Sequence, residues 1–212
     1  MTRREIFNDA LFWQGQSVDA WERERLSGHA AAVLWFTCLS GAGKSTLASA
    51  VERRLHALQC RTFVLDGDNL RHGLCSDLGF SSEDRRENIS RVGEVAALFV
   101  QSGAVVLTAL ISPFEADRER ARRLVPEGRF FEIYCNASVD ECERRDVKGL
   151  YRRARSGEVR DFSGISSPYE APGAPDLVLH TARDSVEQCV DQVLALFQAR
   201  LGRPAGAQPS PA

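Results

Sequence analysis

The sequence predicts a three-layer α/β/α fold, in which helices cover both faces of a five-stranded, mainly parallel sheet. Strand-like and helix-like segments alternate five times along the 212 residues, which is the pattern of strand-helix-strand units. The first strand-like segment is a continuous apolar run, as expected for a strand buried on both faces. The length, with 43% apolar residues, suits a single domain, which we expect to span residues 1–201.

The first half of the chain is expected to hold three strands and two helices. In order, these are a strand at 30–37, a helix at 44–59, a strand at 61–65, a helix that opens at 81–84, and a strand at 104–111. Leu47, Val51, Leu55 and Leu58 recur at helical spacing in the first helix. Serines followed by acidic residues form an N-cap for the second helix, and Gly103 ends it.

The second half is expected to add two strands and three helices. In order, these are a helix at 115–124, a strand at 129–135, a short helix at 139–145, a strand at 176–180 and a final helix up to Leu201. Asp184, with Glu187 three residues later, predicts the N-cap of the last helix. The stretch 146–175 has no sustained period and is predicted to be a long loop or a partly helical lid. The polar, proline-rich tail 202–212 is predicted to be disordered.

Composition and charge narrow the class of protein. Lys and Arg total 27 against 29 Asp and Glu, a formal charge of -2, which argues against a nucleic-acid coat or a polybasic membrane binder. The six cysteines form no C-x-x-C pair, which favours reduced thiols in the cytoplasm over a zinc site or disulfide framework. No secretory signal is evident, and the uncharged run 95–114 is interpreted as a helix end, a glycine turn and a buried strand rather than a membrane span.

A glycine-rich turn between the first strand and the first helix is the strongest single motif. It consists of Ser40, Gly41, Ala42, Gly43, Lys44, Ser45 and Thr46. Glycines let the backbone N–H groups surround a polyphosphate, and the helix N-terminus adds its positive dipole end. Lys44 is expected to reach the β- and γ-phosphates of ATP, and Ser45 to bind Mg²⁺. The alternative, a plain glycine turn with an exposed lysine, fits the strand-turn-helix context less well, so the motif predicts a P-loop NTPase fold.

One position departs from the P-loop pattern. Cys38 stands five residues before Gly43, where the pattern expects glycine. A β-carbon there costs about 1–2 kcal/mol only if the backbone is left-handed. Because Cys38 continues the first strand, we expect an extended backbone with the thiol tucked under the loop. A catalytic thiol is disfavoured, since phosphoryl transfer does not require one.

Two carboxylates follow the second strand, at the sheet edge where parallel α/β folds bind ligands. These are Asp66 and Asp68; in a phosphoryl transferase one carboxylate can orient Mg²⁺, and another can accept the proton of an attacking hydroxyl. An Asp-Gly turn leading into a 3-10 segment is the alternative, and it explains one acid more easily than both.

Longer motifs resemble those of adenylylsulfate kinases (APS kinases). These motifs are the run 65–88, the segment Ile111-Ser112-Pro113-Phe114, the run 146–151 and the run 162–170, and the likeness extends from about Trp13 to Leu201. The resemblance implies an ATP-dependent kinase. It would transfer the γ-phosphate of ATP to the 3'-hydroxyl of adenosine 5'-phosphosulfate (APS), giving 3'-phosphoadenosine 5'-phosphosulfate (PAPS) and ADP in sulfate assimilation.

The resemblance also implies which residues act on APS. The substrate-binding positions would be Asp68, Arg71, Phe80, Arg85, Asn88, Ile111, Ser112, Lys148, Leu150 and Phe162. The two arginines suit the phosphosulfate, and the two phenylalanines could sandwich the adenine. Considered one at a time, each arginine would more simply lie on a solvated helix face, and each phenylalanine could equally pack in the core.

The expected catalytic set is Lys44, Asp66, Asp68 and Ser112. Ser45 and Asp66 are expected on the metal, and Asp68 is expected to orient or deprotonate the 3'-hydroxyl. Ser112 belongs to the Ile-Ser-Pro motif and is treated as a residue that lines the site, because direct in-line transfer needs no phosphoserine. The basic lid 146–175 would close over the phosphates and exclude water. For its outer arginines, a solvated loop is the simpler interpretation.

Some positions differ from the family pattern, and two other functions stay open. Ser90 stands where arginine is usual, Leu110 where phenylalanine is usual, and Val147 where proline is usual. The alternatives are a P-loop kinase of another small hydroxylated substrate and a nucleotide-binding regulatory homologue that has lost catalysis. A homodimer is expected from the family, with ATP sulfurylase as a separate upstream enzyme. Neither nucleic acid nor a membrane is expected as a partner.

Overall fold

A parallel sheet of five strands forms the centre of the protein in a computed structural model, which describes residues 12 and 14–202. The strands are β1 (Ala32–Thr37), β2 (Thr62–Asp66), β3 (Val105–Leu110), β4 (Phe130–Cys135) and β5 (Leu177–Leu179). Their order is β2-β3-β1-β4-β5, and each neighbouring pair is parallel. The predicted five-stranded sheet is therefore confirmed, and β1, the strand that leads into the P-loop, lies at its centre.

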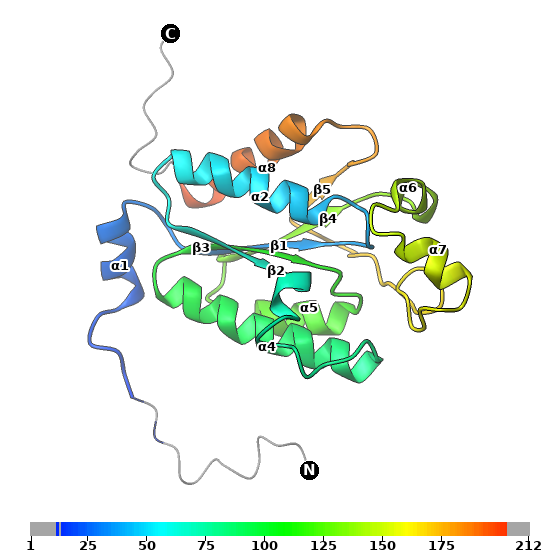
Figure 1. Cartoon of the computed structure of the whole chain (residues 1–212). Coiled ribbons are helices and arrows are strands. Elements are labelled where there is room, and N and C mark those ends of the chain that lie inside the picture. The colour runs from blue at the N-terminus through cyan, green and yellow to red at the C-terminus, as the bar shows by residue number, and fades with distance from the viewer. Residues whose placement is uncertain (1–11, 13, 203–212) are drawn as a thin grey trace.

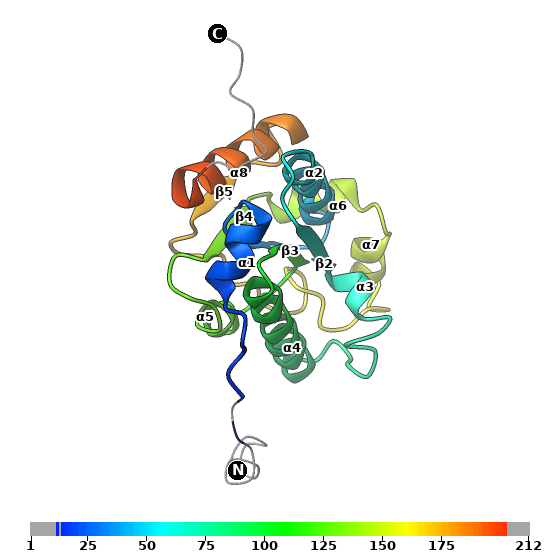
Figure 2. The same cartoon turned by 90° about the vertical axis from the view of Figure 1, so that its left-hand side faces the viewer.

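Helices cover both faces of the sheet, as the alternating pattern predicts (Figure 1). One face carries α2 (Lys44–Ala57) and α8 (Val186–Leu201), which pack on each other. The opposite face carries α4 (Ser82–Gln101) and α5 (Glu115–Arg122). Figure 2 shows the same three layers end-on. The shorter helices are α1 (Ala20–Ser27), α3 (Gly67–Leu70), α6 (Val139–Arg145) and α7 (Leu150–Arg155).

Alternate side chains of β1 enter two different apolar layers. Leu34 and Phe36 pack with the residues of α2 and α8, whereas Val33 and Trp35 pack with those of α4 and α5. All four side chains are fully buried. This explains why the strand is a continuous apolar run, since a strand covered on both faces has no polar side.

The structure changes the predicted elements at their ends and adds two helices, α1 and α3. The last helix is capped one residue later than predicted, by Ser185 and Gln188 in a reciprocal capping box, instead of by Asp184 and Glu187. Helix α1 was not expected, although its own capping box joins Asp19 to the third residue of the helix. The predicted tail lies outside the described residues from position 203 onward.

The segment 95–114 forms the end of α4, a turn and β3, as interpreted from the sequence. Among residues 12 and 14–202, no helix is long and apolar enough to cross a membrane. The predicted lid, 146–175, holds α7 and otherwise irregular chain.

Three loops with polar side chains leave the same end of the sheet. The P-loop follows β1, Asp66 ends β2 with Asp68 just beyond it, and the segment 111–113 follows β3. The lid helix α7 lies at this end in Figure 1, while α1 lies at the other end. The fold thus gathers the predicted motifs at the carboxyl edge, where open parallel sheets bind ligands.

Candidate active site

A cavity of about 290 Å³ lies between these three loops and the start of the lid. Most of the predicted site residues line it: Ser40, Gly41, Gly43, Lys44, Ser45, Thr46, Asp66, Asp68, Arg71, Phe80, Arg85, Asn88, Ile111, Ser112 and Lys148. The cavity therefore joins the predicted ATP-binding loop to the predicted acceptor-binding residues.

The P-loop uses its glycines for left-handed turns. Gly41 and Gly43 have φ angles of 79° and 93°, and a β-carbon on Gly41 would stand 2.9 Å from the carbonyl oxygen of Cys142. Gly43 is the N-cap of α2 and supplies no capping side chain, so no side chain of the cap occupies the first N–H groups of the helix. Such N–H groups form an anion site with the positive end of the helix dipole.

Lys44 is the cation of this loop. Its side chain is buried, and its Nζ donates to the carbonyl oxygen of Leu39 at 2.6 Å. Burial lowers the pKa of Lys44, because the low-dielectric surroundings penalise the charged form. A phosphate would supply the negative charge that this buried ammonium lacks.

Cys38 follows the expectation drawn from its place after the strand. The described non-glycine residues with positive φ are Gln59, Ser112 and Asp161, so Cys38 adopts no left-handed conformation. Its side chain is buried in the core beneath the loop, and burial raises the pKa of the thiol. Replacing glycine by cysteine therefore imposes no positive-φ strain on this P-loop.

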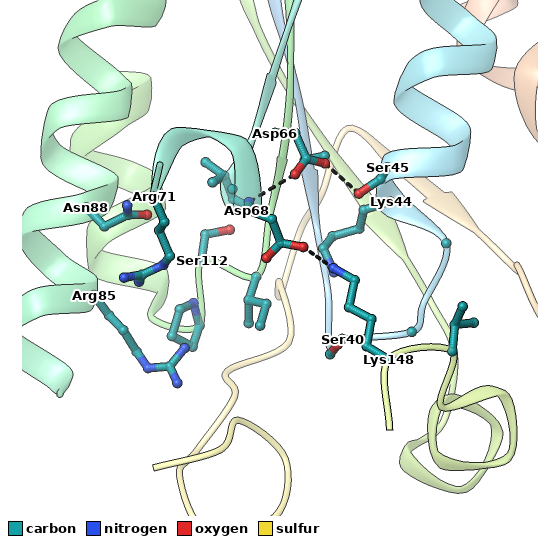
Figure 3. A pocket seen from close by; sticks show the side chains of 18 of the residues that line it. Ser40, Lys44, Ser45, Asp66, Asp68, Arg71, Arg85, Asn88, Ser112 and Lys148 are labelled. Atoms are coloured by element: carbon teal, nitrogen blue, oxygen red, sulfur yellow. Dashed lines mark hydrogen bonds and ion pairs between the residues drawn. The ribbon is translucent and has the colours of Figure 1, made fainter. Parts of the chain in front are cut away.

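The two carboxylates at the end of β2 have different partners (Figure 3). Asp66 accepts a hydrogen bond from Ser45 Oγ at 2.6 Å, and its other oxygen accepts one from the backbone N–H of Asp68 at 3.0 Å. The carboxylate of Asp68 instead pairs with Lys148 from the lid. One acid thus faces the P-loop and the other faces the lid across the cavity.

The Ser45 and Asp66 oxygens suit Mg²⁺. A hydroxyl and a carboxylate are hard oxygen ligands, and their close contact shows that both reach the same point. No cluster of three or more His, Cys, Asp or Glu ligands occurs among the described residues. Mg²⁺ usually keeps several waters and binds substrate phosphates, so it needs only one or two protein ligands such as these.

The acceptor side of the cavity is a stack of arginines on an aromatic ring. The Arg71 guanidinium lies 4.3 Å from the centre of the Phe80 ring, and that of Arg85 lies 5.7 Å from it. Arg71 donates to the carbonyl oxygen of Gly79 at 2.8 Å, and Arg85 donates to that of Asp161 at 2.6 Å. Phe80 is nevertheless 56% exposed. An aromatic surface between two cations suits a flat, anionic ligand such as a nucleotide.

Ser112 is held by contacts on both its side chain and its backbone. Its φ of 40° is unusual for a residue with a β-carbon. Trp35 Nε1 donates to Ser112 Oγ at 3.1 Å, and Ser112 Oγ donates to Thr37 Oγ1 at 2.8 Å. Arg118 donates to the Ser112 carbonyl oxygen at 2.8 Å. The hydroxyl proton of Ser112 therefore points to a threonine and not to a basic group.

Comparison with known proteins agrees with this geometry. The family model described as adenylylsulphate kinase matches residues 30–180. The chain belongs to the adenylylsulphate kinase family. It is 60% identical to the adenylyl-sulfate kinase of Acaryochloris marina over 90% of this chain and 93% of the relative. It is 55% identical to that of Vibrio cholerae over 90% and 88%, respectively.

Solved structures give the same family. The structure of the Mycobacterium tuberculosis APS kinase CysC in complex with AMPPNP and APS matches with a TM-score of 0.76 at 44% identity, covering 80% of this chain and 99% of that one. A gluconokinase from Sinorhizobium meliloti matches with a TM-score of 0.54 at 15% identity, over 81% of this chain and 93% of that one, and so shares only the fold. The gluconokinase therefore shares the architecture, whereas the adenylylsulphate kinases share much of the sequence as well.

Three predicted site residues do not line the cavity of this adenylylsulphate kinase. Phe162 is only 6% exposed and meets Tyr151 edge-on, with ring centres 4.9 Å apart. In this structure the Phe162 ring packs in the core and does not line the cavity beside Phe80. Leu150 packs against the same core, and Ala42 is fully buried in it.

Other residues line the cavity without having been predicted as site residues. They are Gly67, Ile89, Ala109, Leu110, Pro113, Asp146, Val147 and Tyr151. Tyr151 donates to the carbonyl oxygen of Ser40 at 2.9 Å and so ties the lid to the P-loop. Asp146 accepts from the backbone N–H of Tyr151 at 3.0 Å. Both residues lie in the motif 146–151, which could have signalled them, since Lys148 and Leu150 of the same motif were assigned to the site.

Proposed function

We propose that this chain transfers the γ-phosphate of ATP to the 3'-hydroxyl of APS, giving PAPS and ADP. The observation that carries the proposal is the single cavity with the P-loop on one wall, the Arg71–Phe80–Arg85 stack on the other, and Asp68 between them. The Mycobacterium tuberculosis relative, which was solved with AMPPNP and APS, supports the pairing of these two ligands.

The P-loop wall would bind ATP. Lys44 and the N–H groups at the start of α2 would contact the β- and γ-phosphates. Ser45 and Asp66 would hold Mg²⁺, which when bound offsets the negative charge that the phosphates carry during transfer. The buried ammonium of Lys44 gains most from a phosphate, because electrostatic attraction is strong where water is excluded.

The opposite wall would bind and orient APS. The exposed Phe80 ring offers a stacking surface for the adenine, and the arginines beside it offer charge-assisted hydrogen bonds for the phosphosulfate. Asp68 lies between the two walls and would accept the proton of the attacking 3'-hydroxyl. Lys148 of the lid forms an ion pair with Asp68, and when the lid closes over ATP this lysine could pair with a phosphate instead.

Direct in-line transfer fits Ser112 better than a phosphoserine intermediate. A nucleophilic serine needs a base that removes its proton, whereas Ser112 donates that proton to Thr37. Ser112 would therefore line the acceptor site, as expected from the sequence.

The broader setting of the enzyme follows from its chemistry. APS would arrive from a separate ATP sulfurylase, and the six unpaired, buried cysteines support work in the reducing cytoplasm. A homodimer remains our proposal for the assembly. The APS kinase of Thiobacillus denitrificans, a structural relative at 29% identity, is described as hexameric.

A coupled assay of ADP release tests the function. The purified chain is given ATP and Mg²⁺ with APS, with a panel of other hydroxylated acceptors including gluconate, or with no acceptor. We expect ADP release that requires APS, and none above background from a Lys44→Ala variant. Release with another acceptor would identify a different P-loop kinase, and nucleotide binding without release would identify the regulatory homologue.

A further inference from the structure

Behind residues 111–113, which we call the acceptor loop, a chain of hydrogen bonds runs from the core to the end of the lid. Trp35 Nε1 donates to Ser112, which donates to Thr37, and Thr37 Oγ1 donates to the carbonyl oxygen of Ile111 at 2.7 Å. The hydroxyl of Tyr169 lies 3.1 Å from the same Thr37 oxygen. Trp35, Thr37 and Ser112 are all buried, so this chain lies in surroundings where hydrogen bonds are strong and unpaired groups costly.

The direction of each hydrogen bond follows from the groups at its ends. The indole of Trp35 can only donate, and the carbonyl of Ile111 can only accept. The single proton of Thr37 is therefore used on Ile111, and both of its lone pairs are free to accept. Ser112 uses one lone pair of Thr37, so Tyr169 must be the donor to the other.

The residue after Tyr169 fastens the same part of the lid to the acceptor loop. The backbone N–H of Glu170 donates to the carbonyl oxygen of Pro113 at 2.8 Å. The carboxylate of Glu170 accepts from the backbone N–H of Glu115 at 2.7 Å. Glu115 opens α5, whose N-cap, Phe114, offers no capping side chain. Glu170 thus caps α5 from a distant part of the sequence, and the end of the lid is held against the acceptor loop.

We propose that Tyr169 is a positioning residue for phosphoryl transfer, which holds Ile111 and Ser112 at the acceptor site through the hydroxyl of Thr37. Tyr169 itself does not line the cavity, whereas Ile111 and Ser112 do. Without the Tyr169 donor, the Thr37 hydroxyl can rotate away from Ile111. The loop that faces the acceptor then loses the contact that fixes it. The kinetic part of this proposal rests on the proposed function.

Tyr169→Phe is the direct test, and Tyr134→Phe is its matched control. The rings of Tyr134 and Tyr169 stack with centres 6.4 Å apart, so both variants lose one hydroxyl from the same aromatic pair. Of these two tyrosines, it is Tyr169 whose hydroxyl is hydrogen-bonded to Thr37. We expect Tyr169→Phe to lower kcat/KM for APS about three- to tenfold, the worth of one neutral hydrogen bond, with KM for ATP unchanged. Tyr134→Phe should match the wild type.

Thr37 supplies a second pair of variants. Thr37→Val removes both the donor to Ile111 and the acceptor for Ser112 and Tyr169, so kcat/KM for APS should fall more than in Tyr169→Phe. Thr37→Ser keeps the hydroxyl and should restore most of the loss. A fall of equal size in Thr37→Ser and Thr37→Val would overturn the proposal, because it would assign the effect to packing of the methyl group.

Hydrogen exchange tests the same link without any substrate. In Tyr169→Phe, the amides of Glu115 and Glu170 should exchange faster than in the wild type, and in Tyr134→Phe they should not. Equal exchange and equal APS kinetics in the two variants would overturn the role of Tyr169 while the kinase function stands. Conversely, a wild-type protein that shows no APS-dependent turnover would refute the proposed function, and the exchange result would still decide whether Tyr169 holds the loop.

Discussion

The buried ion pair between Arg118 and Glu132 yields the largest loss of stability that we predict for a single substitution. Their side chains are 1% and 7% exposed, and Arg118 Nε lies 2.5 Å from Glu132 Oε1. Arg118→Met keeps most of the apolar stem but removes the charge. It leaves the Glu132 carboxylate buried with a remaining cation, Arg122, at 3.6 Å, and it removes the donor to the Ser112 carbonyl oxygen.

The expected loss can be estimated from the burial of the pair. Removing one partner of a buried ion pair costs about 3–5 kcal/mol, because the remaining charge stays in the interior, and Arg122 at 3.6 Å compensates the Glu132 carboxylate only in part. For a domain of this size, each kcal/mol lowers Tm by about 2–4 °C, so Arg118→Met should lower Tm by about 6–20 °C. Arg54→Met is the matched control, since Arg54 pairs with Asp191 on the surface, where both side chains are more than half exposed. That pair should contribute less than about 1 kcal/mol.

Urea unfolding of Arg118→Met, Glu132→Gln and the double variant completes the test. The double variant leaves neither charge alone, so its loss of unfolding free energy should be at least about 2 kcal/mol smaller than the sum of the two single losses. Two results would refute the reasoning. One is an Arg118→Met variant no less stable than Arg54→Met, and the other is strict additivity of the two single effects.

Three further predictions concern the P-loop, the base and the acid range of pH. In urea unfolding of the nucleotide-free protein, Gly41→Ala should lower the unfolding free energy more than Gly43→Ala. Both glycines are left-handed, but only at Gly41 would the added β-carbon lie 2.9 Å from a backbone oxygen. Equal losses of unfolding free energy in the two variants would contradict this. Asp68→Asn should lower turnover about 100-fold or more in the coupled assay, with ATP affinity by titration within about threefold, and unchanged turnover would remove Asp68 from the chemistry. Two arginines, first Arg144, hold the pKa of Glu141 at about 2 in the folded state against an ordinary 4.5. The stability that this ion pairing contributes above pH 4.5 should therefore be lost as the pH falls toward 2. Over that range, the unfolding free energy of Glu141→Gln should fall less steeply with pH than that of the wild type. Identical slopes in the two proteins would contradict the role of Glu141.

The sequence predicts the strands of this fold better than the ends and additions of its helices. A short, continuous apolar run such as β1 is stable mainly as a strand that is covered on both faces, so its structure can be predicted from the sequence. Helix α1 lacks a buried residue, so hydrophobic periodicity could not indicate it. Its only signal was the spacing of Asp19 and Glu22, which form the capping box. At the last helix, two overlapping cap patterns were present, and local pattern alone did not distinguish Ser185 from Asp184.

The candidate site was predictable where chemistry restricts the residue type. A glycine, a lysine and a hydroxyl at fixed spacing define a phosphate loop, and the structure brings Gly43, Lys44 and Ser45 to the cavity. Phe162 was harder to assign, because an apolar ring suits a nucleobase and a core equally well. Its position depends on the packing of the lid against Tyr151, and that is tertiary information.

The order β2-β3-β1 has a consequence for how this enzyme could be altered. Neighbouring strands in a sheet lie about 4.8 Å apart, so backbone hydrogen bonds fix the spacing between the chain ends that carry the carboxylates, the acceptor loop and the phosphate loop. Lengthening the lid would change how often the site is covered but would leave those separations as they are. A change of acceptor could then be confined to the wall formed by Phe80 and the start of α4, with the distance over which the phosphate travels still set by the sheet.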